Sequence, residues 1–263
     1  MVPSLNIKRV PRGRWRRQGL AVALALAAGA GAILMELQPG FSLWQLLYMQ
    51  SALTFTGHSG EVISVAFSPD GSAALSGAID RTLKLWDATS GSQIRTFIGH
   101  SGSVYSVAFS PDGATALSGT MDRRLTLWDI ASGREIRTFA GHSAEVDSVA
   151  FAPDGATALS GSFDHVLKLW DVGSGREIRT LSAHSRGVTS VAFAPDGRLA
   201  LSGSFDYALK LWDVASGREI RTFTGHLGSI TSVAFAPHGR AALSGSFDGT
   251  LKLWDLSDSR KRN

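Results

Sequence analysis

The sequence predicts an all-β protein: a β-propeller of five four-stranded blades, preceded by one transmembrane helix. Three observations carry this prediction. A unit of 42 residues occurs five times, each unit contains four short strand patterns, and an uncharged apolar stretch precedes the first unit. With 44% hydrophobic and 18% charged residues, the chain has the composition of a packed globular protein.

The repeat has a constant length, without insertion or deletion. One histidine and one tryptophan mark each unit, at His58, His100, His142, His184, His226 and at Trp86, Trp128, Trp170, Trp212, Trp254. Within a unit, "SVAF" predicts the first strand, "SPDG" or "APDG" a turn, "ALSG" the second strand, "LKLW" the third and "REIRTF" the fourth. Neither face of these strands is cleanly polar, so both should be covered, and radial stacking of such sheets is a propeller.

The two ends of the repeat region bear on ring closure. The fifth unit ends at "LWDLSDSR" and lacks a fourth strand, whereas Ser51–Thr56, "SALTFT", precedes the first histidine and matches the "REIRTF" position. We therefore expect this N-terminal strand to complete the last blade and close a five-bladed ring. Two chains forming a larger ring, or an open arc, are the alternatives.

The stretch "GHSGSVYSVAFSPDGATALSGTMDRRLTLWD", Gly99–Asp129, and its four copies resemble the WD40 repeat family over about residues 51–256. The resemblance implies a structural hydrogen-bond network of His, Ser, Asp and Trp in every blade. The residues at the motif positions are His58, Ser76, Asp80, Trp86; His100, Ser118, Asp122, Trp128; His142, Ser160, Asp164, Trp170; His184, Ser202, Asp206, Trp212; His226, Ser244, Asp248 and Trp254.

Positions that vary between units indicate where the surface differs. They flank the repeated aspartate or lie near the start of the first strand. The resemblance implies that they form a partner-binding top face, made of Ile63, Ile79, Arg81, Tyr105, Met121, Arg123, Asp147, Phe163, His165, Phe205, Tyr207 and Phe247. Packing of Phe163, Phe205 and Phe247 between blades is the alternative.

Catalytic chemistry finds little support. The absence of cysteine excludes thiolate catalysis, disulfides and Cys-ligated zinc. No nucleophile elbow, phosphate loop or His-Glu-x-x-His pair is present. Each histidine recurs with its own partners, which indicates a scaffold, so we expect no enzyme, metal or cofactor. A lyase or hydrolase would need an asymmetric acid or base cluster.

The N-terminal region predicts membrane attachment. Residues 1–18 form a basic tail, 19–37 a transmembrane signal anchor, 38–50 an interfacial linker with Phe41, Trp44 and Tyr48, 51–257 the propeller and 258–263 a basic tip. The basic tail predicts a cytoplasmic N-terminus and a propeller on the periplasmic or extracytoplasmic side. A cleaved signal peptide and a buried soluble helix are the alternatives.

These features predict a membrane-tethered scaffold for protein partners, an accessory subunit of a membrane complex in contact with the bilayer through residues 19–37. An exported soluble propeller that binds a small molecule or glycan is the alternative. The basic excess lies in the two tails rather than on a folded face, so we expect no nucleic-acid partner.

Overall fold

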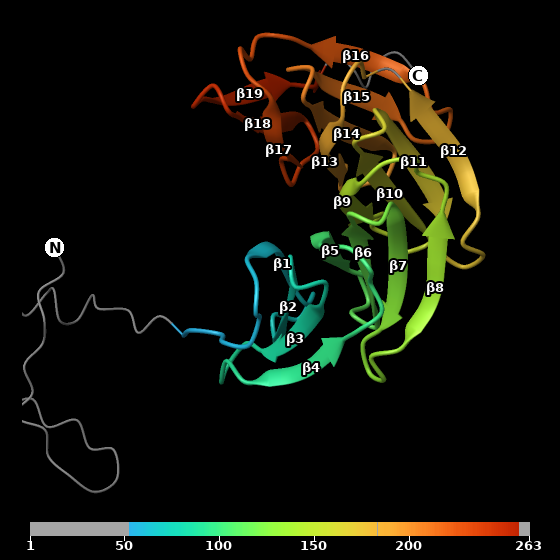
Figure 1. The fold of residues 1–263 in the computed structure, drawn as a ribbon. Coiled ribbons are helices and arrows are strands. Elements are labelled where there is room, and N and C mark those ends of the chain that lie inside the picture. Colours follow the sequence, from blue (N-terminus) through green and yellow to red (C-terminus); the bar gives the residue numbers. More distant parts are fainter. Residues whose placement is uncertain (1–52, 183, 258–263) are drawn as a thin grey trace, which may run out of the picture. The chain divides into compact units, whose positions relative to one another are not determined.

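The computed structural model describes residues 53–182 and 184–257, which form five antiparallel sheets, here called blades one to five in chain order (Figure 1). Blade one contains β1 (Val62–Phe67), β2 (Ala73–Ala78), β3 (Leu83–Asp87) and β4 (Gln93–Phe97). Blade two contains β5 (Val104–Phe109), β6 (Thr115–Thr120), β7 (Arg124–Asp129) and β8 (Glu135–Ala140). Blade three contains β9 (Val146–Phe151), β10 (Thr157–Ser162), β11 (Val166–Asp171) and β12 (Glu177–Ser182). Blade four contains β13 (Val188–Phe193), β14 (Leu199–Ser204), β15 (Leu209–Asp213) and β16 (Glu219–Phe223), and blade five β17 (Ile230–Phe235), β18 (Ala241–Ser246) and β19 (Leu251–Asp255).

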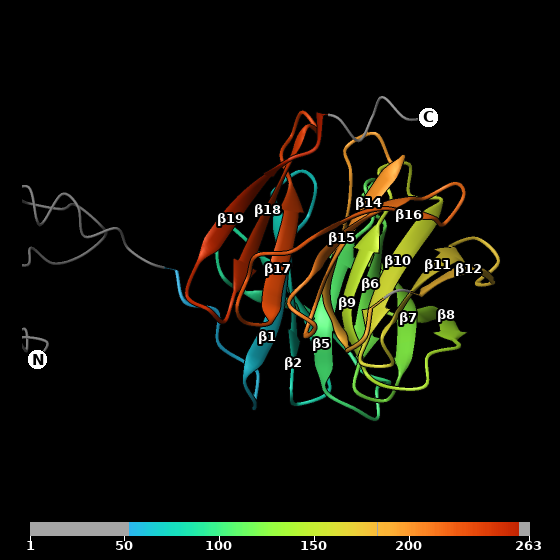
Figure 2. The same cartoon turned by 90° about the horizontal axis from the view of Figure 1, so that it is seen from above.

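The blades stand side by side in a curved row, with β4, β8, β12 and β16 on its outside (Figures 1 and 2). Within each blade the strands pair in chain order because a short turn joins each strand to the next. In the β1–β2 turn the Gly71 N–H donates to the Ser68 carbonyl at 2.9 Å, and Gly71 has a φ of 71°. Glycine adopts this left-handed conformation without a steric penalty.

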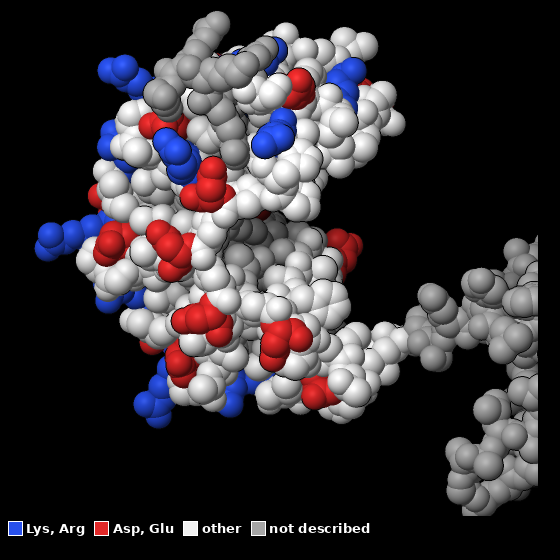
Figure 3. Space-filling model, turned by 180° about the vertical axis from the view of Figure 1, so that it is seen from behind, with Lys and Arg blue, Asp and Glu red and all other residues white. Residues whose placement is uncertain are grey.

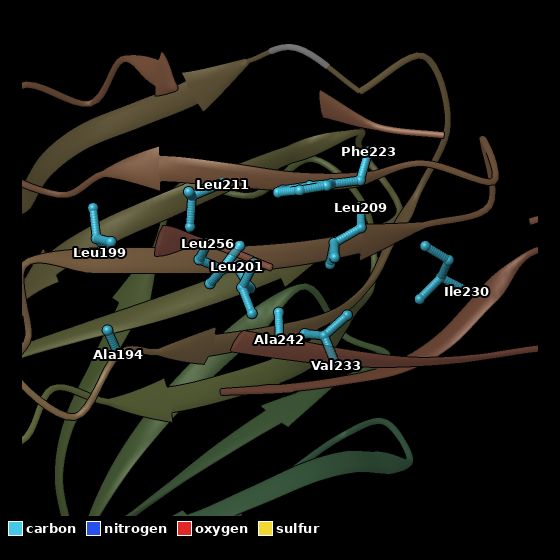
Figure 4. Packing of buried hydrophobic residues seen from close by; sticks show 10 residues of the cluster. All are labelled: Ala194, Leu199, Leu201, Leu209, Leu211, Phe223, Ile230, Val233, Ala242 and Leu256. Carbon is cyan, nitrogen blue, oxygen red and sulfur yellow. The ribbon is translucent and has the colours of Figure 1, made fainter. Parts of the chain in front are cut away.

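The hydrophobic core lies between successive blades. Between blades four and five, Leu201, Leu209 and Leu211 face Ile230 and Val233, and all five are buried (Figure 4). Corresponding clusters fill the other three joints. The predicted coverage of both sheet faces is therefore confirmed for the inner blades, because each lies between two others.

Polar contacts repeat at every joint as well. The Val107 N–H donates to Ser64 Oγ of the preceding blade at 3.0 Å, and the same bond recurs at the other three joints. Phe97, at the end of β4, packs on Trp128 of the next blade with ring centroids 5.7 Å apart. Its neighbour Arg95 donates to carbonyls in the β7–β8 turn of that blade. Each outer strand thus joins its own blade to the following one.

The predicted closing strand is absent from the described residues. Blade five has three strands, and residues 53–56 form no strand on it. Instead Phe55 packs edge-on against Trp86 of blade one, with ring centroids 5.7 Å apart, and Leu53 lies over Gly91 of the same blade. The segment is therefore held by the blade that follows it in the chain.

The predicted spanning segment 19–37 and the linker 38–50 lie outside the described residues. Within residues 53–182 and 184–257, no helix has the length and hydropathy needed to cross a membrane.

Candidate interaction face

A buried hydrogen-bonded chain connects four side chains in blades one, three, four and five. In blade four, Trp212 Nε1–H donates to Ser202 Oγ at 2.8 Å, and this oxygen lies 2.7 Å from His184 Nε2. His184 Nδ1 lies 2.8 Å from Asp206 Oδ2. Since the tryptophan N–H is only a donor, the serine hydroxyl is left to donate to Nε2, and Nδ1–H then donates to the carboxylate. The side chains predicted as a network are adjacent in this order.

This Asp–His–Ser order is also that of a nucleophilic triad, but its surroundings are different. Ser202 is fully buried and its oxygen already accepts a bond from Trp212, so no substrate carbonyl can reach it. The chain instead ties β14 and β15 to the connection that enters the blade at His184. Its geometry is that of a structural element, and we call the His, Ser, Asp and Trp of one blade its clamp.

The clamp aspartates are stabilised as carboxylates. Burial by itself raises the pKa of Asp164, but hydrogen bonds from His142 and the Ser143 amide outweigh it and hold that pKa at about 2. The same balance, with His184 and the Ser185 amide, holds the pKa of Asp206 at about 2. Folding thus favours the ionised form of both groups.

Blade two varies the clamp. His100 keeps its contact with Ser118 Oγ at 2.7 Å, but Asp122 accepts bonds from the side chains of Ser101 and Thr120. Burial lowers the pKa of His100, and the charge of Asp122 opposes that shift only in part. Its imidazole is therefore favoured in the neutral form.

The clamp aspartate also shapes the loop that presents the variable residues. In the β2–β3 loop, Asp80 Oδ1 accepts bonds from the backbone N–H of Thr82 at 3.1 Å and from its hydroxyl at 2.7 Å. The residue after each of the first four clamp aspartates is left-handed, with φ of 67° at Arg81, 71° at Arg123, 75° at His165 and 70° at Tyr207. Blade five has Gly249 there, with φ of 78°. Four side chains are thus retained in a conformation that disfavours them.

The predicted residues near the first strand lie at β-bulges. The pairing register of β1 with β2 shifts between Val62 and Ser64, which places Ile63 at the bulge. The corresponding bulge residues are Tyr105, Asp147, Thr189 and Thr231. An extra residue at such a point re-aims its side chain relative to the rest of the strand.

Backbone hydrogen bonds bring the two variable positions to one end of each blade. The Phe163 N–H donates to the Glu145 carbonyl at 2.9 Å, and Glu145 stands two residues before Asp147. The other four blades contain the same bond. We call this end of the blades the loop face; it consists of the β2–β3-type loops, the preceding His-containing connections and the bulge residues.

Large side chains stand exposed on the loop face. Phe247 is 75% exposed and Phe163 is 50% exposed, and Ile79 and Met121 are exposed at the same position. Phe205 is half-buried and stacks edge-on with Phe163, with centroids 5.8 Å apart. Packing between neighbouring loops therefore occurs at this pair, while Phe247 is open to solvent.

One exposed residue beside this set was not predicted. Leu227 stands where the other four units have serine after the histidine, and it is the most exposed of the large hydrophobic residues described. Its N–H donates to Asp248 Oδ2 at 2.9 Å, which places it next to the Phe247 loop. The break in the repeated serine was the sequence signal that could have identified it.

Asp147 is the one acidic residue among the five bulge residues of the loop face. Burial, followed by the charge of Glu145, raises the pKa of Asp147 to about 6. Burial also raises the pKa of Tyr105, to which the charges of Asp147 and Glu145 add. Among residues 53–182 and 184–257 there is no group of three or more His, Asp or Glu side chains arranged to hold a metal ion.

An open hollow of about 510 Å³ lies at the opposite end of the blades. Its lining is mainly apolar and includes Phe67, Phe109, Phe151, Phe193, Phe235 and the prolines of the β1–β2-type turns. Such a lining offers few partners for sugar hydroxyls.

Seen from behind, the surface carries both acidic and basic side chains, and Lys and Arg lie mainly at its outer edge (Figure 3).

Comparison with known families supports the repeat assignment. Five segments match the family described as WD domain, G-beta repeat: residues 49–87, 91–129, 133–171, 175–213 and 217–255. A search of curated proteins finds no match. Each matched segment after the first begins with the outer strand of one blade and ends with the third strand of the next, so the sequence repeat is offset from the structural blade.

Proposed function

Because the chain belongs to the WD40 family, we propose that it is a scaffold whose loop face binds a protein partner. The observation that carries this proposal is the exposure of Phe163 and Phe247 on hairpin loops anchored by buried clamps. Apolar side chains on a rigid support lose little conformational entropy on binding and supply most of the energy of an interface. Contiguous exposed apolar groups mark interaction sites on protein surfaces, and Phe163 packs on Phe205 of the neighbouring loop.

The left-handed residues support the same proposal. A non-glycine side chain in this region costs about 1 kcal/mol, and glycine would remove that cost. Arg81, Arg123, His165 and Tyr207 nevertheless occupy four of the five positions. Because these four comprise two arginines, a histidine and a tyrosine while the clamps are repeated, the blades present three different kinds of side chain to a partner.

We further propose that the scaffold is tethered to a membrane and serves as an accessory subunit of a membrane complex. The support is the uncharged stretch Gly19–Met35, which follows six basic residues within residues 1–18. A tether of this kind holds the loop face near partners in the same bilayer. Extraction of native membranes with alkaline carbonate tests the tether: the chain should stay in the pellet, with an intact mass that includes residues 1–37.

The partner proposal is tested by purifying the full chain from native membranes in mild detergent. Wild type should retain a partner that the double variant Phe163→Ser, Phe247→Ser loses, with unchanged melting temperature. Ile178→Ser is the matched control, because Ile178 is an exposed apolar residue on the outer strand β12 rather than on the loop face. Equal recovery of the partner by wild type and double variant would exclude this face.

A further inference from the structure

The two ends of the row of blades carry the same apolar residues as the joints inside it. Val65 of blade one is 73% exposed, whereas Val107, its counterpart one unit later, is 6% exposed. Leu253 of blade five is 72% exposed, whereas its counterpart Leu127 is 4% exposed. Terminal units of repeat arrays ordinarily carry polar residues on their outer side, which keeps the ends soluble. Among residues 53–182 and 184–257, no polar residues cap either end of this row in that way.

We propose that the two end faces bind each other between copies of the chain, blade five of one copy against blade one of the next. The leading face is formed by Val62, Val65 and the β1 backbone, and the trailing face by Gly245, Leu251 and Leu253. Inside the chain, each leading face already packs on the trailing face of the blade before it. The two free faces are therefore complementary, as a head-to-tail interface requires.

The glycine of the trailing face shows the fit in detail. A Cβ atom placed on Gly161 would lie 2.6 Å from Val188 Cγ1, because the valine of blade four fills the space over that glycine. A Cβ atom on Gly245 would meet only Thr231 Oγ1 of its own blade, at 3.7 Å. The residue at the Val188 position of blade one is Val62. A second copy would therefore place Val62 over Gly245.

The polar bond of each joint has a matching pair at the ends. The Val233 N–H donates to Ser190 Oγ at 3.1 Å between blades four and five. One unit further, the acceptor is Ser232 Oγ, and the donor at the start of the row is the N–H of Val65. A head-to-tail contact with the geometry of the internal joints would pair them.

The N-terminal segment completes the argument. In blade one, Phe97 of β4 lies opposite Leu83 of β3 and packs on Trp128 of the next blade. Phe55 makes the second of these contacts, on Trp86, but no described strand lies beside it. In the proposed assembly, residues 53–56 of one copy would pair with β19 of the other, with Phe55 opposite Leu251. The outer edge of β19 and the apolar side of Phe55 would be covered together.

The structure favours a second copy over the other end of the same chain. Val65 and Leu253 are both exposed within one chain, so its two ends do not cover each other. Four joints built from equivalent residues already determine the rotation between successive blades. Closing the row on itself would require all of these close-packed joints to bend, which packed interiors resist.

Cysteine cross-linking tests the proposal on the full chain in detergent micelles. The chain contains no cysteine, so any disulfide reports the introduced pair. At the corresponding internal joint, a Cβ atom placed on Gly161 would lie 3.2 Å from Val188 Cβ. This separation is slightly shorter than the Cβ–Cβ distance of about 3.5–4.5 Å that is typical of disulfides. Val62→Cys and Gly245→Cys, prepared as two separate variants with different tags and then mixed, should form a disulfide-linked heterodimer under mild oxidation. Each variant oxidised alone is the control, and neither should form more than a small fraction of homodimer.

The double variant Val62→Cys, Gly245→Cys distinguishes the source of the partner face. Disulfide-linked dimers and longer ladders support association between copies. A disulfide within one chain, or the absence of any disulfide, overturns the proposal. Should the cysteine variants fail to fold, light scattering of the wild-type chain and of Leu253→Glu in the same micelles decides. Wild type should have at least twice the protein mass of Leu253→Glu, and equal masses would overturn the proposal.

Discussion

Phe55 packs edge-on against Trp86 at a centroid separation of 5.7 Å, the same separation as between Phe97 and Trp128 inside the row of blades. The two pairs differ in what surrounds the phenylalanine. Phe97 is fully buried and lies opposite Leu83 on its own sheet, whereas Phe55 is 37% exposed and, within the described part of the chain, packs on the side of blade one. The Phe97–Trp128 contact therefore buries more apolar surface than the Phe55–Trp86 contact.

This difference predicts unequal effects of truncation. Phe97→Ala should lower the free energy of unfolding by about 3–5 kcal/mol, as expected for a buried phenylalanine. Phe55→Ala should lower it by about 1 kcal/mol in dilute protein, because less apolar surface is lost. Urea denaturation followed by tryptophan fluorescence measures both. Equal losses for the two variants would contradict the assignment of Phe55 to an incomplete joint.

The buried clamp predicts a large effect for a small change. Ser202→Ala removes the oxygen shared by Trp212 and His184 and leaves both of their nitrogens without that partner. We expect a loss of about 2–4 kcal/mol in the free energy of unfolding, since each unpaired buried group costs about 1–3 kcal/mol. Ser185→Ala is the control, because Ser185 is exposed and donates to Asp206 through its backbone. A loss below about 1 kcal/mol would contradict the clamp.

Much of this clamp could be predicted from the sequence, and the reason is its repetition. His184, Ser202, Asp206 and Trp212 recur at fixed spacing five times, so their proximity follows once the strands are paired. The strands themselves were predicted by turn residues such as Gly71, which the structure places at a left-handed φ. The left-handed residues Arg81 and Tyr207 could not be predicted, because nothing in their residue type favours that conformation.

The ends of the row show the opposite case. The sequence predicts Ser51–Thr56 in phase with an outer strand, and among the described residues of this segment Phe55 does lie on Trp86 as Phe97 lies on Trp128. The predicted partner sheet was wrong, because a period of 42 residues specifies the blade and not the rotation between blades. That rotation depends on how the residues at the Leu251 and Val65 positions of each unit pack. The same residue types stand at these positions in all five units, so the sequence does not distinguish the exposed end faces from the packed joints.

The left-handed loop position predicts a reciprocal pair of stability changes. Gly249→Ala should destabilise the fold by about 1 kcal/mol through the backbone alone, because a Cβ there meets no atom within 4 Å. Tyr207→Gly should leave the melting temperature unchanged or raise it slightly, while removing a side chain of the loop face. Calorimetry measures both. A clear loss of stability in Tyr207→Gly would show that its contact with Arg186 is worth more than the backbone strain.

The clamp aspartates predict a defined acid response. The pKa of Asp206 is about 2 in the folded chain, below the ordinary aspartate value of 3.8. Its ionised form therefore stabilises the fold fully above about pH 4, and this contribution is lost as the pH falls through 2. Asp206→Asn should be less stable than wild type at pH 7, and the difference should shrink between pH 4 and pH 2. A difference that is constant across this range would contradict the role of the charge.

Asp147 predicts a response of the opposite sign. Burial and the charge of Glu145 raise its pKa to about 6, so above that pH the folded chain carries a carboxylate that is costly to ionise. Asp147→Asn should therefore raise the free energy of unfolding by about 1 kcal/mol at pH 8, a value reduced for the solvent that reaches this side chain. The gain should vanish as the pH falls from 6 to 4, where Asp147 becomes protonated in the folded and then in the unfolded chain. Glu145→Gln should give part of the same gain, because it removes the second cause of the shift. Urea denaturation of the three proteins at pH 4, 6 and 8 provides the measurement, and a gain in Asp147→Asn that persists at pH 4 would show that packing rather than charge is responsible.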